Sequence, residues 1–243
     1  MGRAAAVLVG RPRAVAFVAL AAALTGYYYA VDSIPALATW WDVTLLALGL
    51  MPAVFLLDLL VLPLARARGL LPLALGLGVL ALLAELGDVK VLGNFAKLAA
   101  VTFFAFWFLS LFEELLLLVI VALIIPWVDA YSVFRGPTGE IVEKHPHVFT
   151  HLSFGFPLPG HQTARLGLPD LLFFALFLAA AVRYRLRPGG TWLGMVAFLG
   201  ATVAIAEWTD LAGLPALPAL SLGFLLPNTD LIWLRLRPRP RAA

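Results

Sequence analysis

Two aspartates inside otherwise apolar segments are the residues of this chain best suited to chemistry. Asp129 lies late in one apolar segment, six residues before Arg135, and Asp170 lies early in the next, five residues after Arg165. At about 1.5 Å of helix rise per residue, both carboxyls would lie roughly 8–9 Å below the same membrane face. Ionisable side chains inside a membrane are energetically costly, so each one indicates a function.

Two carboxyls at close range favour general acid–base hydrolysis. Both cannot easily ionise together, so one of them keeps its proton. The ionised carboxyl can take a proton from water while the protonated one polarises a peptide carbonyl, which needs neither a metal nor another cofactor nor a covalent intermediate. The alternative is that Asp129 and Asp170 are unrelated helix-end aspartates that reach toward the interface.

A third element lies on the same side of the predicted topology. Pro215-Ala216-Leu217-Pro218 opens the last apolar segment, and its two prolines remove backbone donors and resist regular helix. Irregular backbone at membrane depth is tolerated only where protein buries it or where it lines a water-filled cavity. Unpaired carbonyls there could accept a substrate strand, or the prolines could mark an ordinary helix start.

The elements that must position these residues are membrane helices. The chain is 63% hydrophobic and 13% charged, whereas a soluble domain is about half apolar and about a quarter charged. Runs of about 20 apolar residues cross a bilayer as helices, because each backbone polar group must be paired there. The chain has no cysteine, which excludes disulfides. Eight segments are predicted to span: 14–30, 43–64, 69–86, 95–112, 115–134, 166–182, 191–206 and 216–234.

Connector charges predict the orientation of these segments. Arginines collect in alternate connectors: Arg3, Arg11, Arg13, Arg66, Arg68, Arg183, Arg185, Arg187, Arg235, Arg237, Arg239 and Arg241. By the positive-inside rule, both termini lie in the cytoplasm and the long connecting loop 135–165 faces outward from the cell (plasma) membrane. Scattered arginines form no basic face, so nucleic acid is not an expected partner.

Two parts of this predicted topology have more than one interpretation. The first apolar segment could be a cleaved signal peptide, although its end in Tyr27, Tyr28 and Tyr29 favours a retained span with interfacial aromatics. Glu113 and Glu114 separate the fourth and fifth segments, either as a tight turn or within one longer helix.

Three motifs occur in an order that resembles a known family. Asp-Ala-Tyr-Ser-Val-Phe from Asp129, Gly-Leu-Pro-Asp ending at Asp170, and Pro-Ala-Leu-Pro from Pro215 look like the signatures of the presenilin and signal-peptide-peptidase intramembrane aspartyl proteases. The archaeal and bacterial homologues are most similar. The resemblance covers about residues 115–234. It implies an all-α, presenilin-like transmembrane bundle of about eight or nine spans. Residues 1–112 would form an amino-terminal scaffold of about four spans, and 113–243 the catalytic region.

The resemblance implies an aspartic intramembrane endopeptidase, a hydrolase that cleaves transmembrane segments or signal peptides of membrane proteins within the lipid bilayer. Asp129 and Asp170 would be its catalytic pair. The substrate-binding residues would be Gly167, Leu168, Pro215, Ala216, Leu217 and Pro218.

Two residues depart from the family pattern. Val128 replaces the usual tyrosine, and Pro169 replaces the glycine before the second aspartate. A non-catalytic, chaperone-like membrane binding protein is therefore one alternative. A proton-coupled transporter is another, because intramembrane carboxyls also relay protons.

Three further features of the sequence each have two interpretations. Gly87-Asp88-Val89-Lys90 resembles an aspartate motif of type IV prepilin peptidases, without its longer glycine-rich run, or is an interfacial loop. Asp58 could contact a substrate or another helix, or reach toward Arg66. The histidines of the long loop could bind zinc or be solvated: His145, His147, His151 and His161.

Overall fold

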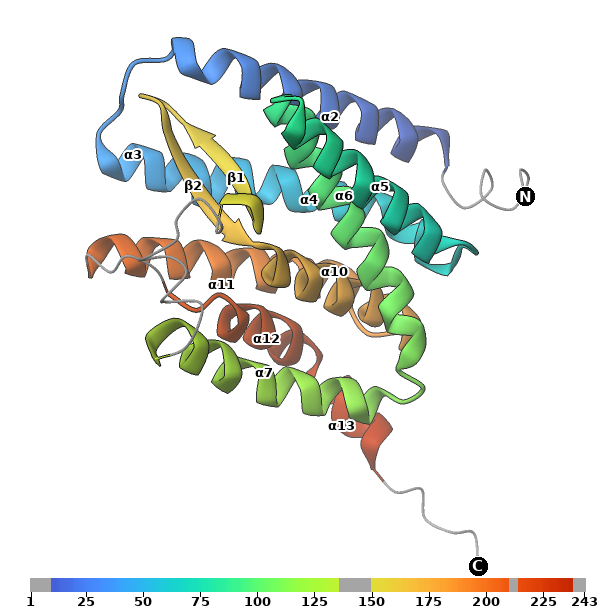
Figure 1. Ribbon diagram of the computed structural model, residues 1–243. Helices are drawn as coiled ribbons and strands as arrows, with labels where there is room; N and C mark the ends of the chain where they lie inside the picture. Colours follow the sequence, from blue (N-terminus) through green and yellow to red (C-terminus); the bar gives the residue numbers. More distant parts are fainter. Residues whose placement is uncertain (1–9, 136–149, 210–213, 238–243) are drawn as a thin grey trace, which may run out of the picture.

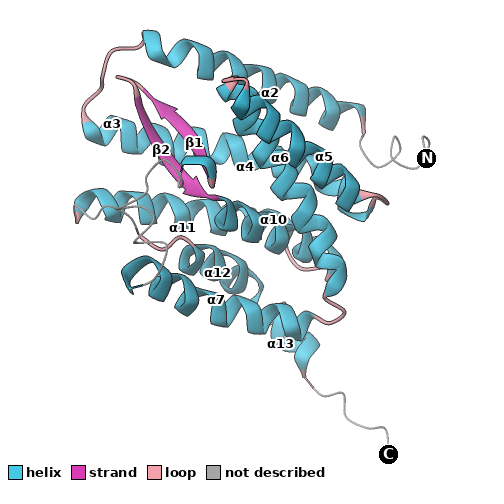
Figure 2. Cartoon of the chain, in the orientation of Figure 1, coloured by secondary structure: helices cyan, strands magenta, loops and turns pink. Residues whose placement is uncertain are grey.

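The computed structural model describes residues 10–135, 150–209 and 214–237, which form a bundle of helices and one two-stranded sheet (Figures 1 and 2). The first half contains α2 (Arg11–Ala30), α3 (Thr39–Thr44), η2 (Leu45–Leu50, a π-helical stretch), α4 (Met51–Val61), α5 (Leu70–Leu86) and α6 (Lys90–Phe108). The second half contains α7 (Leu115–Arg135), β1 (Ser153–Leu158), β2 (Gln162–Gly167), α10 (Leu168–Arg183), α11 (Pro188–Trp208), α12 (Leu217–Leu225) and α13 (Thr229–Leu236). Short 3-10 turns are η1 (Val31–Ser33), η3 (Leu62–Arg66), η4 (Leu109–Leu111) and η5 (Leu226–Asn228).

Six helical segments of the described chain are long and apolar enough to cross a membrane: Arg11–Ser33, Thr39–Arg66, Lys90–Leu111, Leu115–Arg135, Pro188–Trp208 and Leu217–Leu236. The prediction of a multi-pass helical membrane protein is supported, but the predicted count of eight or nine spans is wrong. The segments predicted at 69–86 and 166–182 are helices of only 17 and 16 residues. At about 1.5 Å per residue they are roughly 24–26 Å long, short of the roughly 30 Å hydrocarbon core.

The short helix α10 lies at the centre of the bundle. Leu171 and all residues of 174–181 are buried, and α10 packs against α6, α11 and α12. A helix that is apolar all round is expected in such a core position. Phe174 stacks on Phe55 of α4 with ring centroids 3.9 Å apart, and Phe177 stacks on Phe224 of α12 at 4.8 Å.

Helix α12 crosses α11 at a very close approach. A Cβ atom added at Gly223 would lie 2.3 Å from the backbone nitrogen of Met195, and one added at Gly194 would lie 2.7 Å from the carbonyl oxygen of Gly223. Small residues allow membrane helices to approach in this way. Glycine at both positions therefore fixes how α12 sits in the bundle.

The chain between η4 and α7 is a turn rather than one continuous helix. η4 ends at Leu111 and α7 begins at Leu115, so the turn predicted at Glu113 and Glu114 is confirmed. Two residues at the end of α10 cap the carbonyls before this turn: Arg183 Nη1 donates to the Leu109 oxygen at 2.6 Å, and Tyr184 Oη donates to the Phe112 oxygen at 2.9 Å.

The antiparallel hairpin β1–β2 was not predicted from the sequence, which indicated only a loop over 135–165. Its register runs from Ser153 opposite Gly167 to Leu158 opposite Gln162. The loop between Leu158 and Gln162 has three residues, and two of them, Gly160 and His161, have positive φ. The predicted all-α helical bundle is thus supported, with the addition of one small sheet, which Figure 1 shows leading directly into α10.

The outer edge of β1 is held by the amino-terminal half of the chain. Tyr28 Oη donates to the Gly155 oxygen at 2.9 Å, and Tyr27 Oη donates to the Pro157 oxygen at 3.0 Å. Asn94 of α6 exchanges two hydrogen bonds with the Gly155 backbone, at 2.8 and 2.9 Å. These side chains pair the backbone groups that a neighbouring strand would otherwise pair.

Candidate aspartate site

Asp170 lies in the first turn of α10, where the hairpin ends. Its Oδ2 atom accepts a hydrogen bond from the Gly167 backbone N–H at 3.1 Å. Pro169 is the second residue of the helix, a position where the missing N–H is not needed and the fixed φ suits the backbone. The departure at Pro169 is thus compatible with presenting Asp170 from a helix start.

Gly167 is closely fitted to Asp170. A Cβ atom added at this glycine would lie 3.1 Å from Asp170 Oδ2. Any side chain there would crowd the carboxyl, so the glycine keeps space for it. Leu168, which follows, is partly buried, and its N–H donates to the Leu152 oxygen at 3.0 Å.

Asp129 lies in the last third of α7 and contacts the Pro-Ala-Leu-Pro segment. Its Oδ2 atom accepts a hydrogen bond from the Leu217 N–H at 3.0 Å, across 88 residues of sequence, and the Ala216 N–H also acts on it. The first N–H groups of a helix have no partner inside that helix. Ala216, the residue that precedes α12, supplies no side-chain cap. Asp129 therefore caps α12 from a neighbouring helix, where the positive end of α12 favours a negative charge.

This contact changes the expected role of the segment 215–218. The sequence suggested unpaired carbonyls near the aspartates, whereas the structure places backbone N–H donors there. The side chains of Ala216 and Leu217 are buried in the core, and Pro215 and Pro218 are partly exposed. A substrate-binding role for Ala216 and Leu217 would therefore act through their backbone.

Asp129 and Asp170 lie on two helices, α7 and α10, that are joined through a third. Helix α12 packs against both α7 and α10, and Figure 1 shows it between them. Both side chains are partly buried. The structure thus joins Asp129 to the start of α12 and Gly167 to Asp170, on helices that both pack against α12, and the catalytic role of the aspartates stays a prediction.

A polar network that the sequence analysis missed anchors the start of the hairpin. Lys97 of α6 forms an ion pair with Glu85 at 2.7 Å and donates to the Ser153 oxygen at 2.9 Å. His151 Nδ1 lies 3.1 Å from the other Glu85 oxygen. Lys97 is a charged residue within an apolar segment, and this feature of the sequence could have indicated the network.

The remaining predicted positions lie away from the aspartates. His161 pairs with Asp32 at 3.4 Å, and exposed Asp88 pairs with Lys90 at 3.7 Å, as an interfacial loop would. No group of three potential metal ligands occurs in the described part of the chain. His145 and His147 lie outside the described residues, so the zinc alternative stays open.

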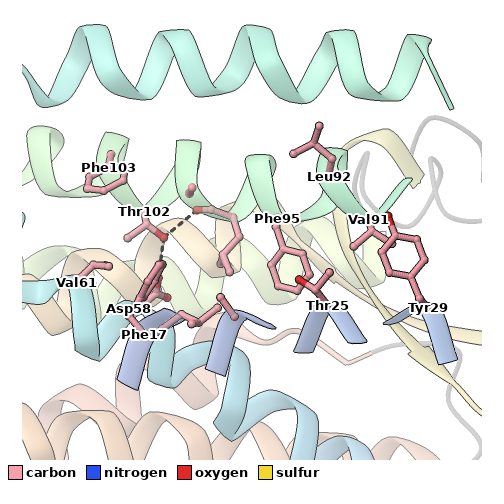
Figure 3. Close-up of a pocket in the computed structure, with 14 residues that line it drawn as sticks. Phe17, Thr25, Tyr29, Asp58, Val61, Val91, Leu92, Phe95, Thr102 and Phe103 are labelled. Atoms are coloured by element: carbon pink, nitrogen blue, oxygen red, sulfur yellow. Dashed lines mark hydrogen bonds between the residues drawn. The ribbon is translucent and has the colours of Figure 1, made fainter. Parts of the chain in front are cut away.

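Asp58 does not reach toward Arg66. It is 2% exposed, and its Oδ1 atom lies 2.7 Å from Thr102 Oγ1 of α6 (Figure 3). Asp58 therefore joins α4 to α6, and a contact with another helix was one of the roles that the sequence suggested.

Neither a scan against protein-family models nor a search of curated proteins finds a match to this chain.

Proposed function

We propose that this protein is an intramembrane aspartic endopeptidase that cleaves transmembrane segments or signal peptides of other membrane proteins. The observation that carries the proposal is that the three motifs gather around one helix, α12, which packs against both α7 and α10. Asp129 accepts a hydrogen bond from Leu217 of Pro-Ala-Leu-Pro and lies within electrostatic reach of Asp170. Asp129 and Leu217 are 88 residues apart in the sequence, and a catalytic site assembled from the three motifs requires such a long-range contact.

The surroundings of the two carboxyls favour different roles for them. Asp129 accepts N–H groups of Leu217 and Ala216 at the positive end of α12, so it has more backbone donors for a negative charge than Asp170 has. Asp170 accepts one N–H, and burial and the charge of Asp129 both disfavour its ionised form. In the proposed reaction Asp129 is therefore the general base and Asp170 is the general acid.

The reaction balances with these two groups and one water molecule. Asp129 takes a proton from water as the water oxygen attacks the peptide carbonyl carbon, and Asp170 gives its proton to the carbonyl oxygen. When the tetrahedral diol collapses, Asp170 regains a proton from a diol oxygen and Asp129 gives its proton to the leaving nitrogen. Both carboxyls then return to their starting states.

The hairpin suggests how a substrate would lie. The outer edge of β1 is occupied by Tyr27, Tyr28 and Asn94, whereas β2 runs into Gly167 and then Asp170. An extended substrate segment added beside β2 would pass the carboxyl pair. Substrate helices would reach this site from the lipid bilayer. We place the protein in the plasma membrane with both termini in the cytoplasm, on the arginine distribution.

A non-catalytic membrane binding protein is the second candidate function. Each aspartate already accepts a backbone hydrogen bond through its Oδ2 atom, as a purely structural helix cap would. In that case the site would hold a transmembrane segment without cleaving it.

A cleavage assay separates the two functions. The purified protein, reconstituted in lipid, is incubated with a panel of peptides that contain a transmembrane segment. The proposed function predicts cleavage within that segment, a loss of roughly 100-fold or more in Asp129→Ala and in Asp170→Ala, and competition by hydroxyl-containing transition-state analogues. Wild-type turnover in either variant would show that the pair is not catalytic, and peptide binding without cleavage by the wild-type protein would favour the second candidate.

A further inference from the structure

A slender groove lies between α2, α4 and α6, and its lining shares no residue with the aspartate site (Figure 3). Its volume is about 390 Å³, and most of its lining is apolar. Helix α2 contributes one residue at every fourth position, which places them on one face: Phe17, Ala21, Thr25 and Tyr29. At about 1.5 Å per residue this face is roughly 18 Å long, the shape of an extended chain. We call this cavity the α2–α6 groove.

The two ends of the α2–α6 groove differ. Near Tyr29, α2 closes on α6, where the ring of Tyr28 lies 5.0 Å from that of Phe95. Figure 3 shows Asp58 and Thr102 toward the opposite end, beside Phe17. Asp58 and Thr102 thus supply polar groups at one end of a groove whose other lining is mostly apolar.

One oxygen of Asp58 has no partner. Asp58 Oδ2 is buried and makes no hydrogen bond, while Oδ1 lies 2.7 Å from Thr102 Oγ1. Thr102 Oγ1 also lies 2.8 Å from the Leu98 carbonyl oxygen. A hydroxyl carries a single hydrogen, and a carbonyl can only accept. The single hydrogen of Thr102 goes either to Asp58 or to Leu98. If it goes to Leu98, a protonated Asp58 donates to Thr102 through Oδ1, and Oδ2 is left as an unpaired acceptor buried beside the groove.

The depth of Asp58 in the membrane indicates which polar group a molecule bound in the groove could carry. Asp58 lies eight residues before Arg66, so it is roughly 12 Å inside the end of its helical segment. A phosphate or ammonium head is held at the membrane interface because its desolvation is costly, whereas a hydroxyl can sink deeper. None of the residues that line the groove is basic, so nothing there would hold an anionic head.

We propose that the α2–α6 groove binds a membrane alcohol, an extended apolar molecule whose single hydroxyl donates a hydrogen bond to Asp58 Oδ2. The apolar body lies along α2 and α6, and the hydroxyl pairs the buried acceptor. This site is independent of the aspartate pair, and it stands whether or not the protein is a protease.

The test compares two photoreactive probes on the full chain in lipid nanodiscs: a long-chain alcohol and its methyl ether, which lacks the donor. The wild-type protein should be labelled more strongly by the alcohol, by roughly three- to tenfold for one neutral hydrogen bond. The crosslinks should map to α2 and α6. The alcohol-to-ether ratio is the readout because a change in groove size affects both probes alike.

Three variants sharpen the result. Asp58→Ala should bring the ratio to about one, because no acceptor remains. Asp58→Asn should keep the ratio, since its amide can donate to Thr102 while its carbonyl accepts from the alcohol. Asp42→Ala is the matched control: Asp42 is also buried with one unpaired oxygen, but it does not line the groove, and the ratio should be unchanged.

Several outcomes would overturn the proposal. Equal labelling of the wild-type protein by alcohol and ether would show that no hydroxyl is recognised, and a preference that survives in Asp58→Ala would place the acceptor elsewhere. A long-chain amine that outcompetes the alcohol in the wild-type protein but not in Asp58→Asn would show that the groove recognises a cation instead.

Discussion

The Asp129–Asp170 pair and Asp58 are acids of the same kind in membrane helices, yet their surroundings differ. Asp129 and Asp170 are partly buried and accept backbone N–H groups at helix starts, whereas Asp58 is 2% exposed and lies within a helix whose N–H groups are already paired. Backbone donors at a helix start stabilise a charged carboxyl, most of all at Asp129, which accepts N–H groups from Leu217 and Ala216, whereas the partner of Asp58 is the Thr102 hydroxyl. All three residues are aspartates, so residue type does not distinguish a candidate catalytic acid from a candidate binding acid. The backbone N–H donors around each carboxyl do.

The largest expected effect comes from replacing each acid by its neutral isostere. Asp129→Asn or Asp170→Asn should lower peptide turnover by roughly 100- to 10,000-fold, because one proton-transfer step is lost. Asp58→Asn should stay within about twofold, because the amide preserves the neutral contact with Thr102. The measurement is kcat for one peptide with all three variants. A large loss of kcat in Asp58→Asn, with no loss in the other two variants, would show that Asp58 is the catalytic acid and that Asp129 and Asp170 are not.

A smaller effect is expected where α12 crosses α11. Gly223→Ala would place a methyl group 2.3 Å from the Met195 nitrogen, and such overpacking costs about 1–3 kcal/mol. Displacement of α12 should also move the N–H donors of Asp129 and lower turnover, while alcohol labelling of the α2–α6 groove stays unchanged. Thermal unfolding and both assays measure this. An equal loss of peptide turnover and of alcohol labelling would mean that the aspartate site and the α2–α6 groove are not independent.

Gly167 offers a more local perturbation of the aspartate site. Gly167→Ala should lower kcat by roughly three- to tenfold, since a methyl group 3.1 Å from Asp170 Oδ2 disturbs its hydrogen bond by about 1 kcal/mol. Gly189→Ala is the matched control, because an added Cβ there meets nothing within 4 Å. If both variants retain full kcat, the fit between Gly167 and Asp170 has no catalytic importance.

The smallest effect concerns the hairpin and the closed end of the groove. Tyr28→Phe removes the hydrogen bond to Gly155 and should lower the free energy of unfolding by about 1 kcal/mol. Tyr29→Phe is the control, because the Tyr29 side chain is 68% exposed. Thermal unfolding compares the two variants. An equal shift in both would indicate that the hydrogen bond to Gly155 adds nothing to stability.

The sequence predicts long apolar helices well, because a run such as 115–134 must pair its own backbone in lipid. It does not predict that α10 is a short buried helix, because hydropathy reports only that a segment is apolar and not whether lipid or protein surrounds it. The hairpin was missed because Pro157 interrupts the strand pattern, and its partners Tyr28 and Asn94 are distant in sequence. The motifs predict that Asp129 and the segment 215–218 lie near one another, whereas the Leu217 N–H donor depends on tertiary structure.

The most direct test of the central claim is cleavage in water enriched in oxygen-18. The account predicts that the wild-type protein cuts a transmembrane peptide and that the new carboxyl end carries one oxygen atom from the solvent. Cleavage by Asp129→Asn or Asp170→Asn should be at least roughly 100-fold slower. A peptide that stays bound to the wild-type protein but never acquires a labelled carboxyl would contradict it.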